Sequence, residues 1–385
     1  MTTSKERMAA VMSGERPDRV PVMCQLSLGH MVLHSDVDLV DFWFTSEGFA
    51  EANMRLTDKY RFDGILLNLT GRDPVLKSRI RRVEAHGDGH LVRWKNGDST
   101  FIPPDDFPRP VNSDSRAPKE GVTGLNDVLV DDIPVHESAA SLPAYFYDIL
   151  DYVLPRRGES HSIHGEVSTA FGRYLAACGG YENGFMGLLD DPPKAREVIA
   201  RCNQSVLVEA LAQCSRGIDA LNLSSPYAGA GFISREMYEA YVLPYEREII
   251  SAVHMAYGIP CYIHTCGAIG DRLDLLAATG IDGLDCLDPP PLGTVELEDA
   301  VAEIGDRLFI KGNLDSVNEL LGAEEPQVHD TVKSRLTIGK RSRRGYILST
   351  ACSVAPRVSP MVLEMLSCLA EQYGGFASDR GGGVE

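Results

Sequence analysis

Short apolar runs alternate with longer stretches of helical periodicity along most of the chain. Each apolar run has the length of a buried strand, and the stretches between the runs repeat their apolar positions at helical spacing. The predicted strands cover residues 20–26, 64–69, 162–168, 220–225, 260–266, 283–288, 308–313 and 346–352. The predicted helices cover residues 3–13, 38–60, 194–216, 234–257, 270–279, 296–304, 326–338 and 360–373.

This alternation predicts an α/β fold with a parallel sheet. The pattern predicts eight buried strands joined by helical crossovers, and eight is the number of strands that closes a (β/α)8 barrel of the TIM type. A doubly wound open sheet is the alternative. Such a sheet would place a glycine-rich phosphate turn after the first strand, and residues 27–30 read Ser-Leu-Gly-His instead.

An insertion interrupts the alternation between the second and third predicted strands. Residues 86–102 predict a hairpin, because strand-like residues flank the turn dipeptide Asn96-Gly97. Residues 103–136 are rich in Pro, Asp, Ser and Gly, as is typical of surface loops. We therefore expect one barrel domain over residues 1–375, an inserted excursion over 84–136 and a disordered tail over 376–385.

Charge and composition exclude several classes of protein. The chain has 385 residues, with 37 Lys and Arg against 55 Asp and Glu, and a formal net charge of −18 at pH 7. This acidic balance repels nucleic acid and anionic membrane surfaces, so we expect neither as a partner. The sequence has no apolar stretch of membrane-spanning length and no apolar segment typical of a secretory signal at its start. Nine scattered cysteines favour reduced thiols and a cytoplasmic location.

Metal-ligating side chains occur at the ends of several predicted strands, where such barrels carry their chemistry. His264 and Cys266 are two residues apart at one strand end, so their side chains face the same side. Cys352 ends the last strand, and Asp288 ends the strand that follows His264. One imidazole, two thiolates and one carboxylate form a tetrahedral set suited to Zn²⁺. Two thiolate ligands favour the binding of a further thiol in its reactive, ionised form.

The same positions yield further candidate residues. Glu166, at the end of the third strand, and Asp288 are the predicted catalytic carboxylates. The predicted substrate-binding residues are Asn222, Ser225, Asn313 and His30. The cysteines interpreted as buried packing are Cys24, Cys178, Cys202, Cys214, Cys261, Cys286 and Cys368. A purely structural metal site, or a small-molecule binding module on a retired enzyme barrel, remains an alternative.

Three stretches carry a resemblance to a known family: HTCGAIGDRLDLLAATGIDGLDCLDPP (264–290), IGDRLFIKGNLDSVNEL (304–320) and GYILSTACSVAPRVSP (345–360). The chain resembles the uroporphyrinogen decarboxylase superfamily, specifically its zinc-dependent methyltransferase branch. Members of that branch pass a methyl group from a methylated corrinoid protein to coenzyme M. The resemblance implies a (β/α)8 barrel with Zn²⁺ at its C-terminal mouth, held by His264, Cys266 and Cys352. Asp288 falls where the more distant methionine synthases have a carboxylate ligand, although Asp replaces the usual Glu.

The resemblance implies a zinc-dependent methyltransferase that moves a methyl group from a methylated corrinoid, such as methylcobalamin, or a small methylated donor to a zinc-activated thiol. A decarboxylase-like lyase and a corrinoid- or folate-linked demethylase of a small compound are the alternatives. Two departures count against the decarboxylase: residues 23–30 lack the arginine of its signature, and Asn68 replaces its essential Asp. The expected partners are a thiol or methylated substrate, a corrinoid protein and a second copy of the chain in a homodimer.

Overall fold

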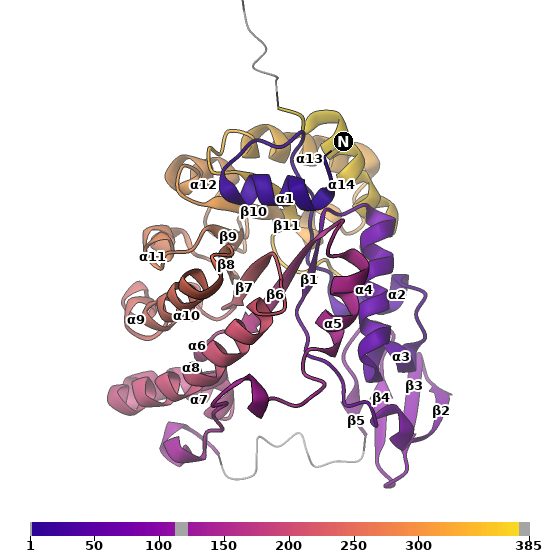
Figure 1. Ribbon diagram of the computed structural model, residues 1–385, viewed down its shortest axis with the longest axis vertical. Helices are drawn as coiled ribbons and strands as arrows, with labels where there is room; N and C mark the ends of the chain where they lie inside the picture. The colour runs from indigo at the N-terminus through magenta and orange to yellow at the C-terminus, as the bar shows by residue number, and fades with distance from the viewer. Residues whose placement is uncertain (1, 112–121, 377–385) are drawn as a thin grey trace, which may run out of the picture.

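Seven parallel strands form the central sheet of the molecule. The computed structural model describes residues 2–111 and 122–376 (Figure 1). The strands, each paired with the next in this order, are β1 (Gly64–Leu67), β6 (Ser162–Ser168), β7 (Ala220–Ser224), β8 (Cys261–Thr265), β9 (Gly283–Cys286), β10 (Phe309–Leu314) and β11 (Tyr346–Thr350). All seven lie within predicted strands or within one residue of them, and their parallel pairing confirms the predicted sheet.

The first predicted strand, residues 20–26, closes the sheet into a barrel. Val22 makes a parallel bridge to Leu348 of β11, and its carbonyl accepts a hydrogen bond from the Asp63 amide, 2.7 Å away, at the start of β1. This segment therefore lies between β11 and β1, although it forms isolated bridges and no continuous ladder. Pro21 has no backbone N–H to donate, which interrupts the ladder. The TIM-type barrel is thus confirmed.

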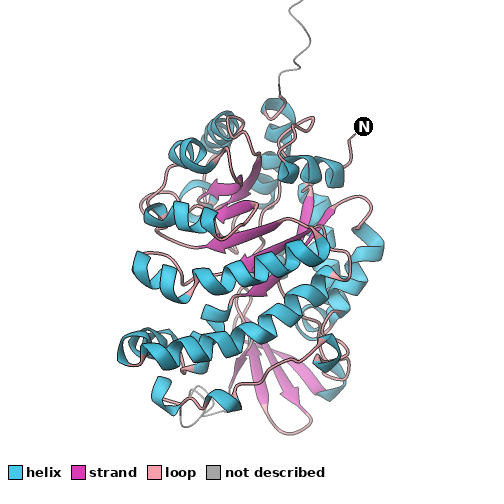
Figure 2. Ribbon diagram, turned by 60° about the vertical axis from the view of Figure 1, so that its left-hand side comes forward, coloured by secondary structure: helices cyan, strands magenta, loops and turns pink. Residues whose placement is uncertain are grey.

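Helices cover the outside of the barrel, as Figure 2 shows. Two long predicted helices are each divided in two. Thr45 caps the second half of one by accepting a hydrogen bond from the Gly48 amide (3.0 Å), and Pro244 lies in the first turn of the second half of the other. The helices over 28–34, 148–157, 170–177 and 181–190 were missed. The helices are α2 (Leu28–His34), α3 (Leu39–Phe44), α4 (Ser46–Tyr60), α5 (Asp148–Arg157), α6 (Ala170–Ala177), α7 (Tyr181–Asp190), α8 (Pro192–Cys214), α9 (Arg235–Tyr241), α10 (Leu243–Tyr257), α11 (Leu273–Ala278), α12 (Leu297–Ile304), α13 (Glu325–Gly339) and α14 (Pro360–Tyr373).

The N-terminal helix α1 (Ser4–Ser13) closes one end of the barrel. Its apolar side chains form a buried cluster with residues of the strands, separate from the larger core between strands and helices. The cluster consists of Met8, Val11, Met12, Met23, Leu66, Ala220, Tyr262, Phe309 and Ile347. Side chains alternate along a strand, so the residues two positions further along each of these strands also point into the barrel. They lie nearer its other end. Those positions hold polar residues, including Asn222, His264 and Lys311.

The insertion forms a four-stranded antiparallel sheet, at the lower right of Figure 1. Its strands are β2 (Ile80–His86), β3 (Gly89–Trp94), β4 (Ser99–Ile102) and β5 (Arg109–Pro110). The Asn96-Gly97 hairpin is confirmed, with Gly97 at φ 98°. His86 ends β2 and is not part of the hairpin strand, because a second turn at Gly87 (φ 60°) precedes β3. The predicted tail lies outside the described residues from 377 onward.

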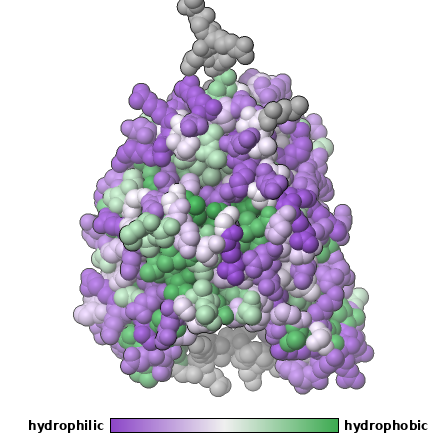
Figure 3. Space-filling model, in the orientation of Figure 1, coloured by the Kyte–Doolittle hydropathy of each residue, from purple (hydrophilic) through white to green (hydrophobic). Residues whose placement is uncertain are grey.

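The molecular surface varies in hydropathy across one face (Figure 3). Hydrophilic residues dominate the face shown in Figure 3, and hydrophobic residues gather towards its middle. Among the described helices, none has the length and apolar character needed to cross a membrane.

Candidate metal centre

Three predicted metal ligands converge at the C-terminal ends of β8 and β11. Nε2 of His264 lies 3.3 Å from Sγ of Cys266 and 3.9 Å from Sγ of Cys352, and the two sulfurs are 3.8 Å apart. Cys352 lies 86 residues after Cys266 and 88 after His264 in the chain, and the barrel's closure brings it beside them. The predicted grouping of these side chains is therefore present in the structure.

The His264 ring is oriented by a row of residues across three neighbouring strands. His264 lies directly opposite Asp285 in the register of β8 and β9, and Asp285 lies opposite Lys311 in that of β9 and β10. Nδ1 of His264 is 2.9 Å from one Asp285 oxygen, and Nζ of Lys311 is 2.9 Å from the other. With Nδ1–H donating to the carboxylate, the Nε2 lone pair faces the two thiols.

Burial opposes the charge on Asp285, but its two partners overcome that cost. Desolvation acts to raise the pKa of Asp285, while the Lys311 ammonium and the His264 ring hold it below its ordinary value. Asp285 is therefore an ionised, hydrogen-bonded support for the imidazole. A carboxylate behind a ligating histidine is a common second layer of zinc sites in proteins.

The three donor atoms fit zinc in kind and spacing. Zinc binds thiolate sulfur at about 2.3 Å and imidazole nitrogen at about 2.0–2.1 Å, which gives a tetrahedron with edges of roughly 3.6–3.8 Å. The separations of 3.3, 3.8 and 3.9 Å between the His264, Cys266 and Cys352 donors lie within about 0.3 Å of those edges. Such a set leaves a fourth position for another ligand.

Asp288 and Cys286 lie beside the same centre. One carboxylate oxygen of Asp288 accepts a hydrogen bond from the Gly267 amide at 2.7 Å. Donor atoms of Cys266, Cys286 and Asp288 all lie within 4.8 Å of one another, so Cys266 belongs to both groups. Cys286 was interpreted as packing because it sits inside a predicted strand. The strand ends at Cys286 itself, whose φ is 84°.

Glu166 and Asn222 form a second polar pair inside the barrel. They face each other in the register of β6 and β7, and the Asn222 amide donates to the Glu166 carboxyl at 3.1 Å. Burial, opposed by the nearby His264 ring, raises the pKa of Glu166 to about 7. The Asn222 carbonyl oxygen is buried and has no hydrogen-bond partner among the described residues. Glu166 also lines a small cavity of about 50 Å³ together with Asn68.

Two other predicted substrate-binding residues, Ser225 and Asn313, make side-chain hydrogen bonds to neighbouring residues of the protein. The Ser225 hydroxyl is buried 3.2 Å from that of Thr169, and the Asn313 amide donates to the Leu287 carbonyl at 3.0 Å. The Asn313 carbonyl oxygen has no partner in the described part of the chain.

His30 lies in a separate buried pair. Nε2 of its ring is 2.7 Å from the Tyr60 hydroxyl, and Nδ1 is 3.2 Å from the Pro356 carbonyl oxygen. Burial lowers the pKa of His30 to about 3, so the ring is neutral at physiological pH. Both ring nitrogens are thus occupied by other residues, and within residues 2–111 and 122–376 no hydrogen bond joins His30 to the metal ligands.

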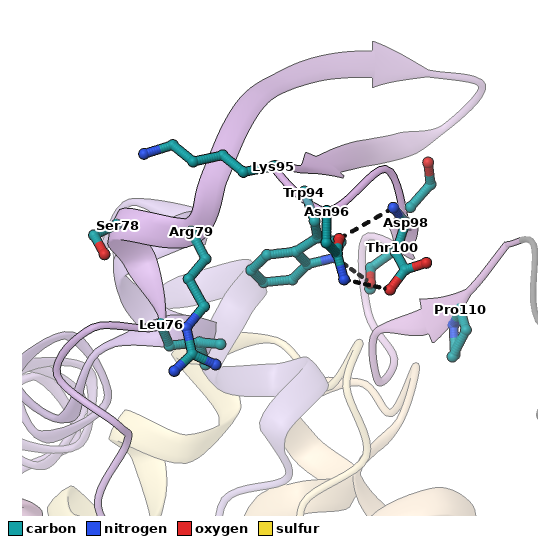
Figure 4. Close-up of a pocket in the computed structure, with 10 residues that line it drawn as sticks. Leu76, Ser78, Arg79, Trp94, Lys95, Asn96, Asp98, Thr100 and Pro110 are labelled. Carbon is teal, nitrogen blue, oxygen red and sulfur yellow. Dashed lines mark hydrogen bonds between the residues drawn. The ribbon is translucent and has the colours of Figure 1, made fainter.

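A cavity of about 930 Å³ lies in the inserted sheet and does not include the candidate site residues (Figure 4). Trp94 forms one wall and donates its indole N–H to the Thr100 hydroxyl at 2.8 Å. Asn96 and Asp98 close the hairpin end through a 2.7 Å hydrogen bond, and Arg79 approaches from the segment before β2. Despite its size, this cavity is therefore separate from the centre formed by the predicted metal ligands.

Comparison with known proteins assigns the family. The model of the uroporphyrinogen decarboxylase (URO-D) family matches residues 127–373. The chain belongs to this family. The matched segment contains every candidate metal ligand and both members of the Glu166–Asn222 pair.

Relatives of this URO-D family member include both transferases and decarboxylases. Methylcobamide:CoM methyltransferase MtbA of Methanosarcina acetivorans is 26% identical over 172 residues, which cover 45% of this chain and 47% of that protein. The methylated-thiol–coenzyme M methyltransferase of Methanosarcina mazei is 28% identical over 176 residues, 46% of this chain and 44% of that protein. Uroporphyrinogen decarboxylase of Chlorobium chlorochromatii is 25% identical over 186 residues, 47% of this chain and 49% of that enzyme. The matches span about half the length of each relative.

A solved structure confirms the fold over the whole chain. A methyltransferase from Methanosarcina mazei superposes with a TM-score of 0.68 at 15% sequence identity, covering 97% of this chain and 99% of that one. At this identity the likeness establishes the shared barrel architecture and nothing about substrate.

Proposed function

We propose that this chain is a zinc-dependent methyltransferase that transfers a methyl group from a methylated corrinoid, or a small methylated donor, to a thiol. The observation that carries the proposal is the convergence of His264, Cys266 and Cys352 at one end of the barrel, with separations that suit tetrahedral zinc. When bound there, zinc would supply the Lewis acidity that keeps a substrate thiol ionised at neutral pH.

The protein's own residues hold and orient this centre. His264 and the two cysteines supply three ligands, and Asp285 fixes the imidazole so that Nε2 faces them. Lys311 keeps the Asp285 carboxylate in place through a buried 2.9 Å contact. Asp288 is the second proposed catalytic carboxylate, and the distance of its donor oxygen from Cys266 Sγ, within 4.8 Å, supports a role beside the centre.

Glu166 is the proposed proton acceptor for the substrate thiol. A pKa near 7 keeps a fraction of this carboxyl ionised at neutral pH while leaving it basic enough to take a proton. Asn222 orients the carboxyl, and its buried oxygen, which has no partner within residues 2–111 and 122–376, offers a hydrogen-bond acceptor to a polar substrate. Asn313 offers a second buried oxygen that no other described residue bonds. Ser225 and His30 remain proposed substrate-binding residues, and only their places after predicted strands support this role.

Relatives and charge favour methyl transfer over decarboxylation. Two of the relatives described above are named as methyltransferases that act with coenzyme M. A porphyrinogen with many carboxylates needs several cationic partners, whereas the Lys311 ammonium is already paired with Asp285. Residues 23–30 contain no arginine. We further propose a corrinoid protein as methyl donor, a homodimer as the assembly and the cytoplasm as the location.

A direct assay tests the proposed function. The purified chain, supplied with zinc, is mixed with methylcobalamin and either coenzyme M or homocysteine, and the methylated thiol is quantified by mass spectrometry. We expect thiol-dependent methylation that a Cys266→Ser variant loses by at least about 100-fold. A Cys178→Ser variant, altered at a buried thiol outside the centre, serves as the control. Release of carbon dioxide from uroporphyrinogen, without methyl transfer, would replace this function with the decarboxylase.

A further inference from the structure

Two buried amide oxygens on the inner wall of the barrel lack a hydrogen-bond partner among the described residues. They are the Oδ1 atoms of Asn222 on β7 and Asn313 on β10, and both side chains are fully buried. The Asn222 amide is held by the bond that it donates to the Glu166 carboxyl, 3.1 Å away. The Asn313 amide is held in the same way by the Leu287 carbonyl, 3.0 Å away. Burying an acceptor without a donor is costly, so both positions favour a ligand that donates hydrogen bonds.

Asn222 lies close to the predicted metal ligands on the inner wall. It comes two residues before Ser224, which is opposite His264 in the register of β7 and β8. From the spacing of neighbouring strands and the rise per residue, the Cα atoms of Asn222 and His264 are about 8 Å apart. Cys266 and Cys352 are partly exposed, so a substrate can reach this end of the barrel from solvent. A short carbon chain would therefore link a sulfur at the metal ligands with a group at the amide.

In the described part of the chain, no buried lysine or arginine remains for an anionic substrate group. Each that is buried already has a partner: Asp63 for Arg7, the Ala228 carbonyl for Arg272 and Asp285 for Lys311. The Glu166 carboxyl beside Asn222 makes this part of the wall still less favourable to an anion. A carboxylate or sulfonate has no hydrogen to donate to an amide oxygen, whereas an amine has. The wall beside the metal ligands therefore suits an amino group.

We propose that the thiol substrate is an aminothiol, whose amino group donates a hydrogen bond to the Asn222 oxygen while its sulfur lies at the metal ligands. This inference rests on the proposed function, because it assigns a chemical class to the thiol that accepts the methyl group. A protonated amine supplies both N–H donors and a positive charge beside the Glu166 carboxyl. A sulfonate-bearing thiol such as coenzyme M would leave the Asn222 oxygen unpaired and bring a negative charge to the same carboxyl.

Three thiols that share an HS–CH₂–CH₂ segment test the class of substrate. Cysteamine ends in an ammonium group, 1-propanethiol in a methyl group and coenzyme M in a sulfonate. With zinc-supplied protein and methylcobalamin, we expect kcat/KM for cysteamine to exceed that for 1-propanethiol at least about 10-fold and that for coenzyme M at least about 100-fold. Equal or better use of either other thiol would overturn the aminothiol assignment and leave the proposed function intact. Methylation of none of the three, nor of homocysteine, would overturn both.

Substitution of Asn222 tests which residue recognises the amino group. Asn222→Leu removes the oxygen, so the ratio of kcat/KM for cysteamine to that for 1-propanethiol should fall at least about 10-fold. A general loss of activity would lower both values and leave the ratio unchanged, which would contradict the assignment. The control is Asn203→Leu on α8, which should keep the ratio of the wild type. Asn203 is also buried, donates to Glu248 at 2.7 Å and has an oxygen without a partner among the described residues.

Binding of the methylated products gives a readout that needs neither metal nor turnover. Calorimetric titration of the metal-free protein compares S-methylcysteamine with methyl-coenzyme M. We expect the amine to bind at least about 10-fold more tightly, and Asn222→Leu to remove this difference. Equal binding of the two thioethers by the wild type would contradict the recognition of an amino group.

Discussion

Lys311 and Asp285 form an ion pair inside the barrel, with Nζ and Oδ1 2.9 Å apart and each side chain about 1% exposed. The second oxygen of the same carboxylate holds the His264 ring. A charge at this position has no access to water, so it is stable only with an oppositely charged partner beside it. The pair thus links the stability of the barrel interior to the orientation of a metal ligand.

Removal of the cation should destabilise the protein strongly. Lys311→Met leaves Asp285 buried without its ammonium partner, and we expect the free energy of unfolding of the metal-free protein to fall by about 3–5 kcal/mol. Urea unfolding followed by circular dichroism measures the change. Lys95→Met, which alters an exposed lysine of the inserted sheet, is the control and should stay within about 0.5 kcal/mol of the wild type. A loss below about 1 kcal/mol for Lys311→Met would contradict the buried pairing.

Neutralising the Asp285 carboxylate should weaken metal binding, in addition to leaving the buried Lys311 ammonium without its charged partner. Asp285→Asn keeps the shape of the side chain but removes the charge that supports His264, so zinc affinity should fall about 10–100-fold. Competition with a chromophoric chelator gives the affinity. The control is Asp282→Asn, which alters a similar histidine–carboxylate contact (His254 Nε2 to Asp282 Oδ2, 2.8 Å) away from the metal ligands. Equal effects of the two substitutions would show that Asp285 has no special role.

The role of Glu166 predicts a specific pH dependence. Because burial raises its pKa to about 7, the ionised form that accepts a proton becomes populated as pH rises through about 7. The rate of thiol methylation should therefore rise with pH and level off above this value. Glu166→Gln should lower the rate by about 10²–10⁴-fold and abolish this rise. A pH profile of the variant that keeps the same shape would exclude Glu166 as the proton acceptor.

Glu246 provides the matched control for that experiment and a prediction of its own. This carboxyl on α10 is buried, accepts the Tyr238 hydroxyl at 2.7 Å, and has its other oxygen without a partner among the described residues. Burial raises its pKa to about 7. Since its folded-state pKa lies above the unfolded value, protein stability should increase as pH falls from about 8 towards 5.

Glu246→Gln should remove the part of that dependence that comes from Glu246. The variant has no carboxyl that ionises at this buried position at pH 8, so its free energy of unfolding should exceed that of the wild type there by about 1–3 kcal/mol, and the difference should shrink towards pH 5. Urea denaturation at both pH values measures it. The pH profile of methyl transfer should keep its rise near pH 7 in this variant. Lower stability at pH 8 than in the wild type would contradict the assigned cost of the buried carboxylate.

The sequence allows the barrel to be predicted because each strand is a local apolar run and each crossover is a local periodic stretch. It does not reveal that Pro21 breaks the first ladder, since that effect depends on pairing with β11 and β1. The helices α6 and α7 were missed because their eighteen residues include three glycines, which lower helical propensity in a local pattern.

The sequence allows the candidate site to be predicted only where a residue of a metal-binding or catalytic type stands at the end of a predicted strand. His264, Cys266 and Cys352 were accessible because each follows an apolar run. The support that Asp285 and Lys311 give to His264 could not be predicted, because it depends on the register between three strands that are distant in sequence. Cys286 was assigned to packing because it sits inside a predicted strand, and its left-handed backbone is not visible in the pattern of apolar residues.

The zinc content of the purified protein tests the central claim most directly. Mass spectrometry of the wild type should find about one zinc per chain, and a His264→Ala/Cys352→Ala double variant should lose it while keeping the circular dichroism spectrum of a folded barrel. The control variant His254→Ala should retain the metal, because His254 contacts Asp282 and none of the metal ligands in the described residues. A wild type that holds no zinc after careful preparation, and takes up none when zinc is added, would contradict the account.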